Sequence, residues 1–256
     1  MPGNSKTTDP KFEFALRMGD NCLILGQQVG AWCGHAPAIE EDIALANVAL
    51  DLIGQTRLWL AYAGKVEGAG RSADDLAFLR DARDFRNALL VEQPNGDFGQ
   101  TLMRQFLFDA WHYPMLDALT GSSESEIAEI AEKSVKEASY HLERSRDLVI
   151  RLGDGSDESH RRMQTALDEL WRFAGELTTS DDVDEALAVA GIVPDLAEIE
   201  ARYLDIVRAA CDAATLALPE DAFMQSGGKT GMHTEALGYL LADMQFLQRA
   251  YPGATW

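Results

Sequence analysis

The sequence predicts an all-α protein that folds as an up-and-down helical bundle with extra helices toward its C-terminus. Apolar residues recur at spacings of three and four along most of the chain, which is the pattern of helices with one buried face. No segment shows the alternation of apolar and polar residues that is typical of a strand. The chain has 256 residues, 46% of them hydrophobic, and this is enough to bury one sizeable core.

Glycine- and proline-containing breaks divide the pattern into long and short helices. We expect the long helices at 12–32, 38–65, 98–120, 123–152 and 159–178, and the short ones at 73–91, 182–190, 195–216 and 234–250. The first four long helices carry the pattern of a bundle core, with a long crossover between the second and the third. Residues 12–250 are therefore expected to form a single domain between a flexible N-terminus, 1–11, and a tail, 251–256.

The charge of the chain excludes some classes of partner. Its formal net charge of −20 repels nucleic-acid backbones and anionic lipid, so neither is expected to bind. No apolar run approaches the roughly 18 residues of a membrane helix, and the polar N-terminus has no signal-peptide core. Cys22, Cys33 and Cys211 form no CxxC pair, which predicts reduced thiols. We therefore expect a cytoplasmic protein.

Four of the long helices each place one ionisable residue within the buried stripe. These residues are Asp20, Asp51, Asp109 and His141. Burying an unpaired charge is costly, so each of them needs a partner. In ferritin-like di-iron proteins, two helices each supply a carboxylate and the other two each supply a Glu-x-x-His pair, all pointing inward. The predicted bundle is therefore ferritin-like.

On that template the chain supplies only part of a metal site. Three residues after Asp51 stands Gly54 rather than a histidine, and three residues before His141 stands Ala138 rather than an acid. We interpret these positions as a vestigial metal site with no catalytic residue and no cofactor in this chain. The preferred interpretation is a metal-free hydrogen-bonded network around a charged histidine. The positions are Asp20, Asp51, Gly54, Asp109, Ala138 and His141.

Eight short motifs, in order along the chain, indicate a family. They are 16–23 (LRMGDNCL), 32–37 (WCGHAP), 44–55 (ALANVALDLIGQ), 90–96 (LVEQPNG), 109–112 (DAWH), 136–141 (KEASYH), 170–173 (LWRF) and 227–238 (GGKTGMHTEALG). With these motifs the chain resembles the C-subunit family of phenylacetyl-CoA epoxidases, from about residue 12 to the end.

The resemblance implies a subunit of a bacterial multicomponent di-iron monooxygenase that acts in aerobic phenylacetate breakdown. Such a complex epoxidises the aromatic ring of phenylacetyl-CoA with O2 and with electrons from NADPH, which arrive through a separate reductase subunit. The catalytic A subunit holds the di-iron site. The C subunit is its ferritin-like homologue with an incomplete ligand set. The resemblance thus implies a non-catalytic, structural role, with the A subunit as partner in a hetero-oligomer and phenylacetyl-CoA near the interface.

The densest basic stretch, 80–87, is a candidate for contact with the CoA thioester. Arg80, Arg83 and Arg86 are spaced by three, so a helix over 73–91 would present all three on one face. Arginine suits phosphate, and CoA carries several phosphates. The alternative is a solvated face whose arginines pair with Asp81 and Asp84. The candidate contacts are Arg80, Arg83, Asp84, Phe85, Arg86 and Asn87.

Two other functions stay open at this point. One is a self-sufficient di-iron or mixed-metal ferritin-like oxidoreductase, with Asp20, Asp51, Asp109 and His141 as ligands. The other is a ferritin-type storage protein, which predicts assembly into a large shell. Metal analysis of the purified chain tests the first, and its size in solution tests the second.

Overall fold

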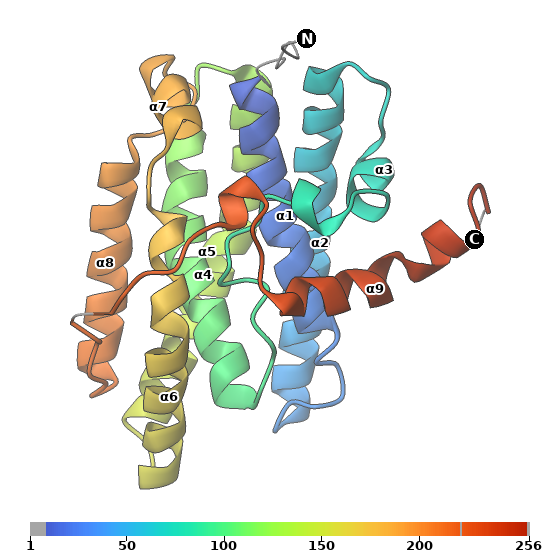
Figure 1. Cartoon of the computed structure of the whole chain (residues 1–256). Helices are drawn as coiled ribbons and strands as arrows, with labels where there is room; N and C mark the ends of the chain where they lie inside the picture. Colours follow the sequence, from blue (N-terminus) through green and yellow to red (C-terminus); the bar gives the residue numbers. More distant parts are fainter. Residues whose placement is uncertain (1–8, 221, 255–256) are drawn as a thin grey trace.

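A computed structural model describes residues 9–220 and 222–254, and in this range the chain is helical without a strand (Figure 1). The all-α fold predicted from the sequence is confirmed. The bundle consists of four long helices: α1 (Pro10–Gly30), α2 (Ile39–Glu67), α4 (Phe98–Leu119) and α5 (Ser125–Gly153). Short links join α1 to α2 and α4 to α5, so the members of each pair run antiparallel, and a crossover at 68–97 joins the two pairs.

Polar side chains define where two of the long helices, α1 and α4, begin. The carboxylate of Asp9 accepts a hydrogen bond from the backbone N–H of Lys11 at 2.8 Å and caps α1. Asp97 caps α4 in the same way by accepting from the N–H of Gln100 at 2.9 Å. Such caps satisfy backbone donors that the first turn of a helix leaves free. Both helices therefore begin within about two residues of the predicted positions, a difference that is normal at helix ends.

The crossover differs from the prediction. Its α-helix, α3 (Ala73–Phe78), is short and is followed by a 3-10 turn, η1 (Ala82–Asp84), so the predicted helix over 73–91 is wrong beyond Phe78. The backbone of 85–93 is held by distant side chains instead. Asp20 and Asn21 of α1 accept from the N–H groups of Arg86 and Ala88, each at 2.8 Å. These bonds replace those that a helix would have formed.

The C-terminal half adds the smaller helices. They are α6 (Asp157–Leu170), η2 (Trp171–Phe173), η3 (Gly175–Leu177), α7 (Asp182–Val189), α8 (Leu196–Ala213), η4 (Gly228–Thr230) and α9 (Glu235–Ala250). The predicted helix over 159–178 is wrong after Leu170, where 3-10 turns place Trp171 in a stack with Tyr203. The short helices predicted at 182–190, 195–216 and 234–250 are confirmed within a few residues.

These helices cover the bundle on two sides (Figure 1). α6 and α8 pack against α4 and α5, whereas α7 packs against the first part of α1. α9 crosses α1 and α3, and its last turns extend away from the bundle. The described part of the chain contains no helix with the length and hydropathy needed to span a bilayer.

The predicted domain limits are tested only in part. α1 begins at Pro10, two residues before the predicted start of the domain at 12. Residues 1–8 of the predicted flexible N-terminus and residues 255–256 of the predicted tail lie outside the described residues. The single domain over 12–250 stays a prediction.

Candidate functional site

His141 and Asp51 join α5 to α2 at the edge of the bundle interior. His141 is buried, and its Nε2 lies 3.0 Å from Asp51 Oδ2. The side chain of Asp51 is 36% exposed, so the carboxylate lies between the interior and solvent. The other ring nitrogen of His141, Nδ1, has no hydrogen-bond partner among the described residues. The pair thus uses one ring nitrogen of the histidine.

Asp109 lies deeper in the bundle and is held by neutral donors. Its Oδ1 accepts from Gln105 Nε2 at 2.7 Å, and its Oδ2 accepts from Ser145 Oγ at 2.8 Å. Burial raises the pKa of Asp109 to about 6, although the nearby charge of His141 and the two hydrogen bonds lower it. The carboxyl group is therefore close to half protonated in mildly acidic solution.

A second polar chain crosses the interior from α1 to α5. Cys22 Sγ lies 3.8 Å from both Gln55 Oε1 and His112 Nε2, and Gln55 Nε2 donates to Glu137 Oε2 at 2.9 Å. Burial lowers the pKa of His112 to about 3 and raises the pKa of the Cys22 thiol above its usual value. At neutral pH both groups are therefore uncharged.

Asp20 belongs to a different cluster. Its Oδ2 lies 3.0 Å from Arg80 Nη1, its Oδ1 accepts a second bond from Arg80 Nη2, and the backbone N–H of Arg86 also donates to it. The side chains of Asp20 and Arg80 are almost fully buried, and the guanidinium lies 4.3 Å from the centre of the Phe85 ring. The predicted grouping of Asp20 with His141 and Asp109 is therefore wrong, because the Asp20 carboxylate forms its ion pair with Arg80 of the crossover instead.

The predicted register of α2 is wrong by one residue. Gly54 lies on the exposed side of α2, and a Cβ atom added there would meet no atom within 4 Å. The buried position is Gln55, the next residue. Asp51 lies at the edge of the interior, and the residue three positions later, Gly54, lies beyond that edge and faces solvent. On α5 the prediction was correct, since Ala138 and His141 are both buried.

These residues do not fit a di-iron centre. Within 9–220 and 222–254, no group of three or more His, Cys, Asp or Glu side chains lies close enough to hold a metal ion. Di-iron centres of ferritin-like bundles use roughly four carboxylates and two imidazoles that converge on one place. Here the carboxylates of Asp20, Asp51 and Asp109 are each engaged with a different protein partner.

The predicted arginine face does not form, because the chain leaves the helical conformation after Phe78. Arg80 is buried against Asp20, and Phe85 and Asn87 are also buried. Arg86 is half-buried and pairs with Glu13 at 3.0 Å. The remaining two of the six candidates, Arg83 and Asp84, are exposed. This segment therefore presents no common surface to a ligand.

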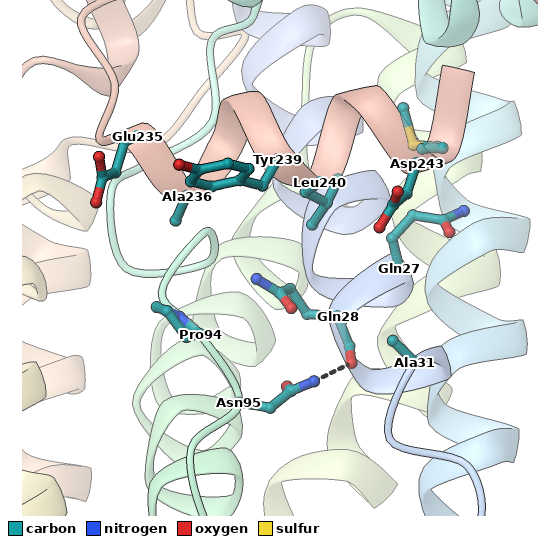
Figure 2. Close-up of a pocket in the computed structure, with 11 residues that line it drawn as sticks. Gln27, Gln28, Ala31, Pro94, Asn95, Glu235, Ala236, Tyr239, Leu240 and Asp243 are labelled. Atoms are coloured by element: carbon teal, nitrogen blue, oxygen red, sulfur yellow. Dashed lines mark hydrogen bonds between the residues drawn. The ribbon is translucent and has the colours of Figure 1, made fainter. Parts of the chain in front are cut away.

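A groove of about 440 Å³ lies between the end of α1, the loop at 94–95 and α9 (Figure 2). Tyr239 and Leu240 of α9 lie opposite Gln28 and Asn95, and Asn95 Nδ2 donates to the backbone carbonyl of Gln28 at 2.8 Å. The residues that line it include two acids and no lysine or arginine. The groove therefore does not suit the phosphate groups of a CoA thioester. The acids are Glu235 and Asp243.

Comparison with known proteins identifies the family. A family model described as "Phenylacetic acid catabolic protein" matches residues 2–256. The chain belongs to the phenylacetic acid catabolic protein family. It is also 49% identical over 243 residues to the C subunit of the 1,2-phenylacetyl-CoA epoxidase of Escherichia coli (strain K12), a match that covers 95% of this chain and 98% of the relative. The resemblance that the eight motifs indicate is thus confirmed.

In this member of the phenylacetic acid catabolic protein family, two motifs far apart in sequence form one buried cluster. Glu92 accepts from Asn87 Nδ2 at 3.0 Å and from the backbone N–H of Thr234, and it lies 2.8 Å from His233 Nδ1. Burial by itself lowers the pKa of His233, but the hydrogen bond to Glu92, the charge of Glu92 and the contact with the Phe85 carbonyl raise it overall. The cluster fixes the start of α9 on the crossover.

Sequence reasoning missed several of these partners. Ser145 follows His141 by four residues, and Gln105 precedes Asp109 by four, so the members of each pair are neighbours on one helix face. This spacing is a signal from which Ser145 and Gln105 could have been predicted to lie near the buried ionisable residues. No such signal joins Glu92 to His233. The two residues are 141 positions apart, and only the path of the chain brings them together.

Proposed function

We propose that this chain is the non-catalytic, structural subunit of a phenylacetyl-CoA epoxidase, bound to a catalytic A subunit that holds the di-iron site. Its E. coli relative is named as the C subunit of 1,2-phenylacetyl-CoA epoxidase, and the match extends over nearly the whole of both chains. The complex would epoxidise the aromatic ring of phenylacetyl-CoA, with this chain as a required partner. Its free thiols, Cys22, Cys33 and Cys211, suit the reducing cytoplasm, where we expect the complex to act.

The structural role is supported by the hydrogen bonds and ion pairs that the buried ionisable residues form within the chain. Arg80 neutralises Asp20, His141 faces Asp51, and Asp109 accepts from two neutral donors. Asp20, Asp109 and Nε2 of His141 therefore each have a protein partner, and these contacts join elements that are far apart in the chain. Buried polar groups that are satisfied in this way stiffen a core without any bound ion.

The role of these residues would be to hold the bundle in one shape for its partner. Asp51 and His141 connect α2 to α5, and Ser145 and Asp109 connect α5 to α4. The ion pair of Asp20 and Arg80 fixes the crossover on α1. A rigid helical surface loses little conformational entropy on binding, which favours a stable complex.

Co-expression with the A subunit tests the proposal. We expect turnover of phenylacetyl-CoA, with the reductase and NADPH supplied, only when both chains are present, and iron only in the separately purified A subunit. In this chain His141→Ala should leave turnover per folded complex within about twofold, as should the control Val189→Ala, which changes an exposed residue of α7. Near-stoichiometric iron in this chain, lost together with turnover in His141→Ala, would instead support the self-sufficient oxidoreductase.

Within the basic stretch 80–87, contact with the CoA thioester stays a prediction for the arginines that reach the surface. Arg83 is exposed and Arg86 is half-buried. Binding of phenylacetyl-CoA to the assembled complex, measured for Arg83→Ala and Arg86→Ala, tests it. Unchanged affinity in both variants would remove this segment from the substrate site.

A further inference from the structure

Helix α2 has apolar residues on the side that faces the bundle and also at exposed positions on the opposite side. Residues 43–63 contain two charged side chains, Asp51 and Arg57. Leu52 and Trp59 are fully buried on the inner side. On the outer side, however, Ile43 is 57% exposed and Leu50 is 69% exposed. Two large apolar side chains exposed on one helix face that carries few charges are typical of a contact surface, so the outer side of α2 is a candidate for one.

The exposed residues of α2 are spaced for packing against another helix. They follow one another at alternating steps of four and three residues, an average of about 3.5, which is the period of a left-handed helix–helix seam. At Gly54 a Cβ would meet no atom within 4 Å, so a neighbouring backbone could approach closely there. We call these residues the outer seam of α2. They are Ile43, Asn47, Leu50, Gly54, Arg57 and Ala61.

The charge of the outer seam indicates what kind of helix fits it. The chain as a whole has a net charge of −20, yet the seam carries a single charged residue, and this residue, Arg57, is positive. A partner helix with an apolar stripe and one carboxylate opposite Arg57 would be complementary to it. A second copy of this chain fits less well, because it would bring another net charge of −20 to the same contact.

We propose that the outer seam of α2 is the docking surface for an amphipathic helix of the catalytic subunit, with a carboxylate of that helix opposite Arg57. This inference rests on the proposed function and adds the place of contact to it. The seam runs beside Asp51, whose carboxylate bonds His141 of α5. Tyr140, next to His141, is also exposed. Docking would therefore cover the exposed edge of the Asp51–His141 pair.

Affinity between the purified full-length chain and the purified catalytic subunit tests the docking surface. We expect Leu50→Glu and Ile43→Glu each to weaken binding at least about 30-fold, since each places a charge within an apolar contact. Arg57→Glu should weaken binding roughly tenfold, with the loss reduced at high salt. The matched control is Val189→Glu, which changes an exposed apolar residue on α7, away from α2 (Figure 1). It should bind like the wild type.

The possible outcomes separate this inference from the proposed function. Wild-type affinity in Leu50→Glu and Ile43→Glu, both with unchanged melting temperature, would overturn the docking surface and leave the structural role standing. An equal loss in Val189→Glu would overturn it too. If the chain alone formed a dimer that Leu50→Glu dissolved, without any change in binding to the catalytic subunit, the occupant would be a second copy and the proposal would be wrong. Failure of the wild-type chain to bind the catalytic subunit would overturn the proposed function itself.

Discussion

Nε2 of His141 in α5 lies 3.0 Å from Oδ2 of Asp51 in α2, and this contact joins residues that are 90 positions apart in the chain. Removing the carboxylate leaves the buried imidazole without its partner, and removing the imidazole leaves the partly exposed carboxylate without one. We expect Asp51→Asn and His141→Gln each to lower the free energy of unfolding by about 1–2 kcal/mol, a modest loss because Asp51 is partly exposed.

Urea unfolding of the two single variants and of the double variant measures this effect. The double variant should lose less than the sum of the two single losses, because both changes remove the same interaction. Ser139→Ala, an exposed position on α5 close to His141 in the chain, is the control and should stay within about 0.5 kcal/mol of the wild type. Strictly additive losses would show that the two residues do not act together.

Asp109 should make the stability of the protein depend on pH. Burial raises its pKa from 3.8 to about 6 in the folded state, so the protonated form is favoured by folding. Its contribution is complete below about pH 4, is lost as the pH rises through 6, and does not return at higher pH. Asp109→Asn removes this titration and should be more stable than the wild type at pH 8, by on the order of 2–3 kcal/mol.

The comparison must be made between the variant and the wild type at each pH, because other groups also titrate. The advantage of Asp109→Asn should shrink toward zero as the pH falls from about 8 to about 4. Denaturant unfolding over this range measures it. A difference that did not change with pH would mean that Asp109 titrates at the same pH in the folded and unfolded chains.

Removing one member of the Asp20–Arg80 ion pair should strongly lower the stability of the fold. Both side chains are nearly inaccessible to solvent, so Asp20→Asn or Arg80→Ala leaves an unmatched buried group. Removing one partner of such a pair typically costs about 3–5 kcal/mol. Thermal unfolding should show this loss, whereas the exposed control Arg83→Ala should change stability by less than about 0.5 kcal/mol. An Arg80→Ala variant of normal stability would contradict a structural role for Arg80.

Two glycines near α9 should respond to alanine in opposite directions. A Cβ at Gly228 would lie 2.0 Å from the backbone oxygen of Asn87, so Gly228→Ala must push the 227–234 segment off the crossover. A Cβ at Gly238, within α9, would meet nothing within 4 Å. Gly238→Ala should therefore stabilise the protein by up to about 1 kcal/mol through helix propensity, whereas Gly228→Ala should destabilise it by more than that. Melting temperatures of the two variants decide this, and a loss in both would contradict it.

The long helices could be predicted because their signal is local. Apolar spacing of three and four residues places α1, α2, α4 and α5 within a few residues of their observed ends. The same signal failed over 73–91, where the backbone N–H groups of Arg86 and Ala88 bond to side chains of α1. A local pattern cannot report a competing donor or acceptor that lies more than 60 residues away.

The candidate site likewise combines features that a local sequence pattern predicts with contacts that it does not predict. The sequence by itself determined the all-α fold and the burial of Asp20, Asp109 and His141, because these follow from residue type and from spacing along one helix. It also determined the family, through motifs in a fixed order along the chain. Only the tertiary structure decided which groups meet: Arg80 turns inward to Asp20, and Gln55 rather than Gly54 faces the interior. The physical reason is that a buried charge takes the partner that the packing of the whole chain brings within about 3 Å, and helix periodicity does not specify that partner.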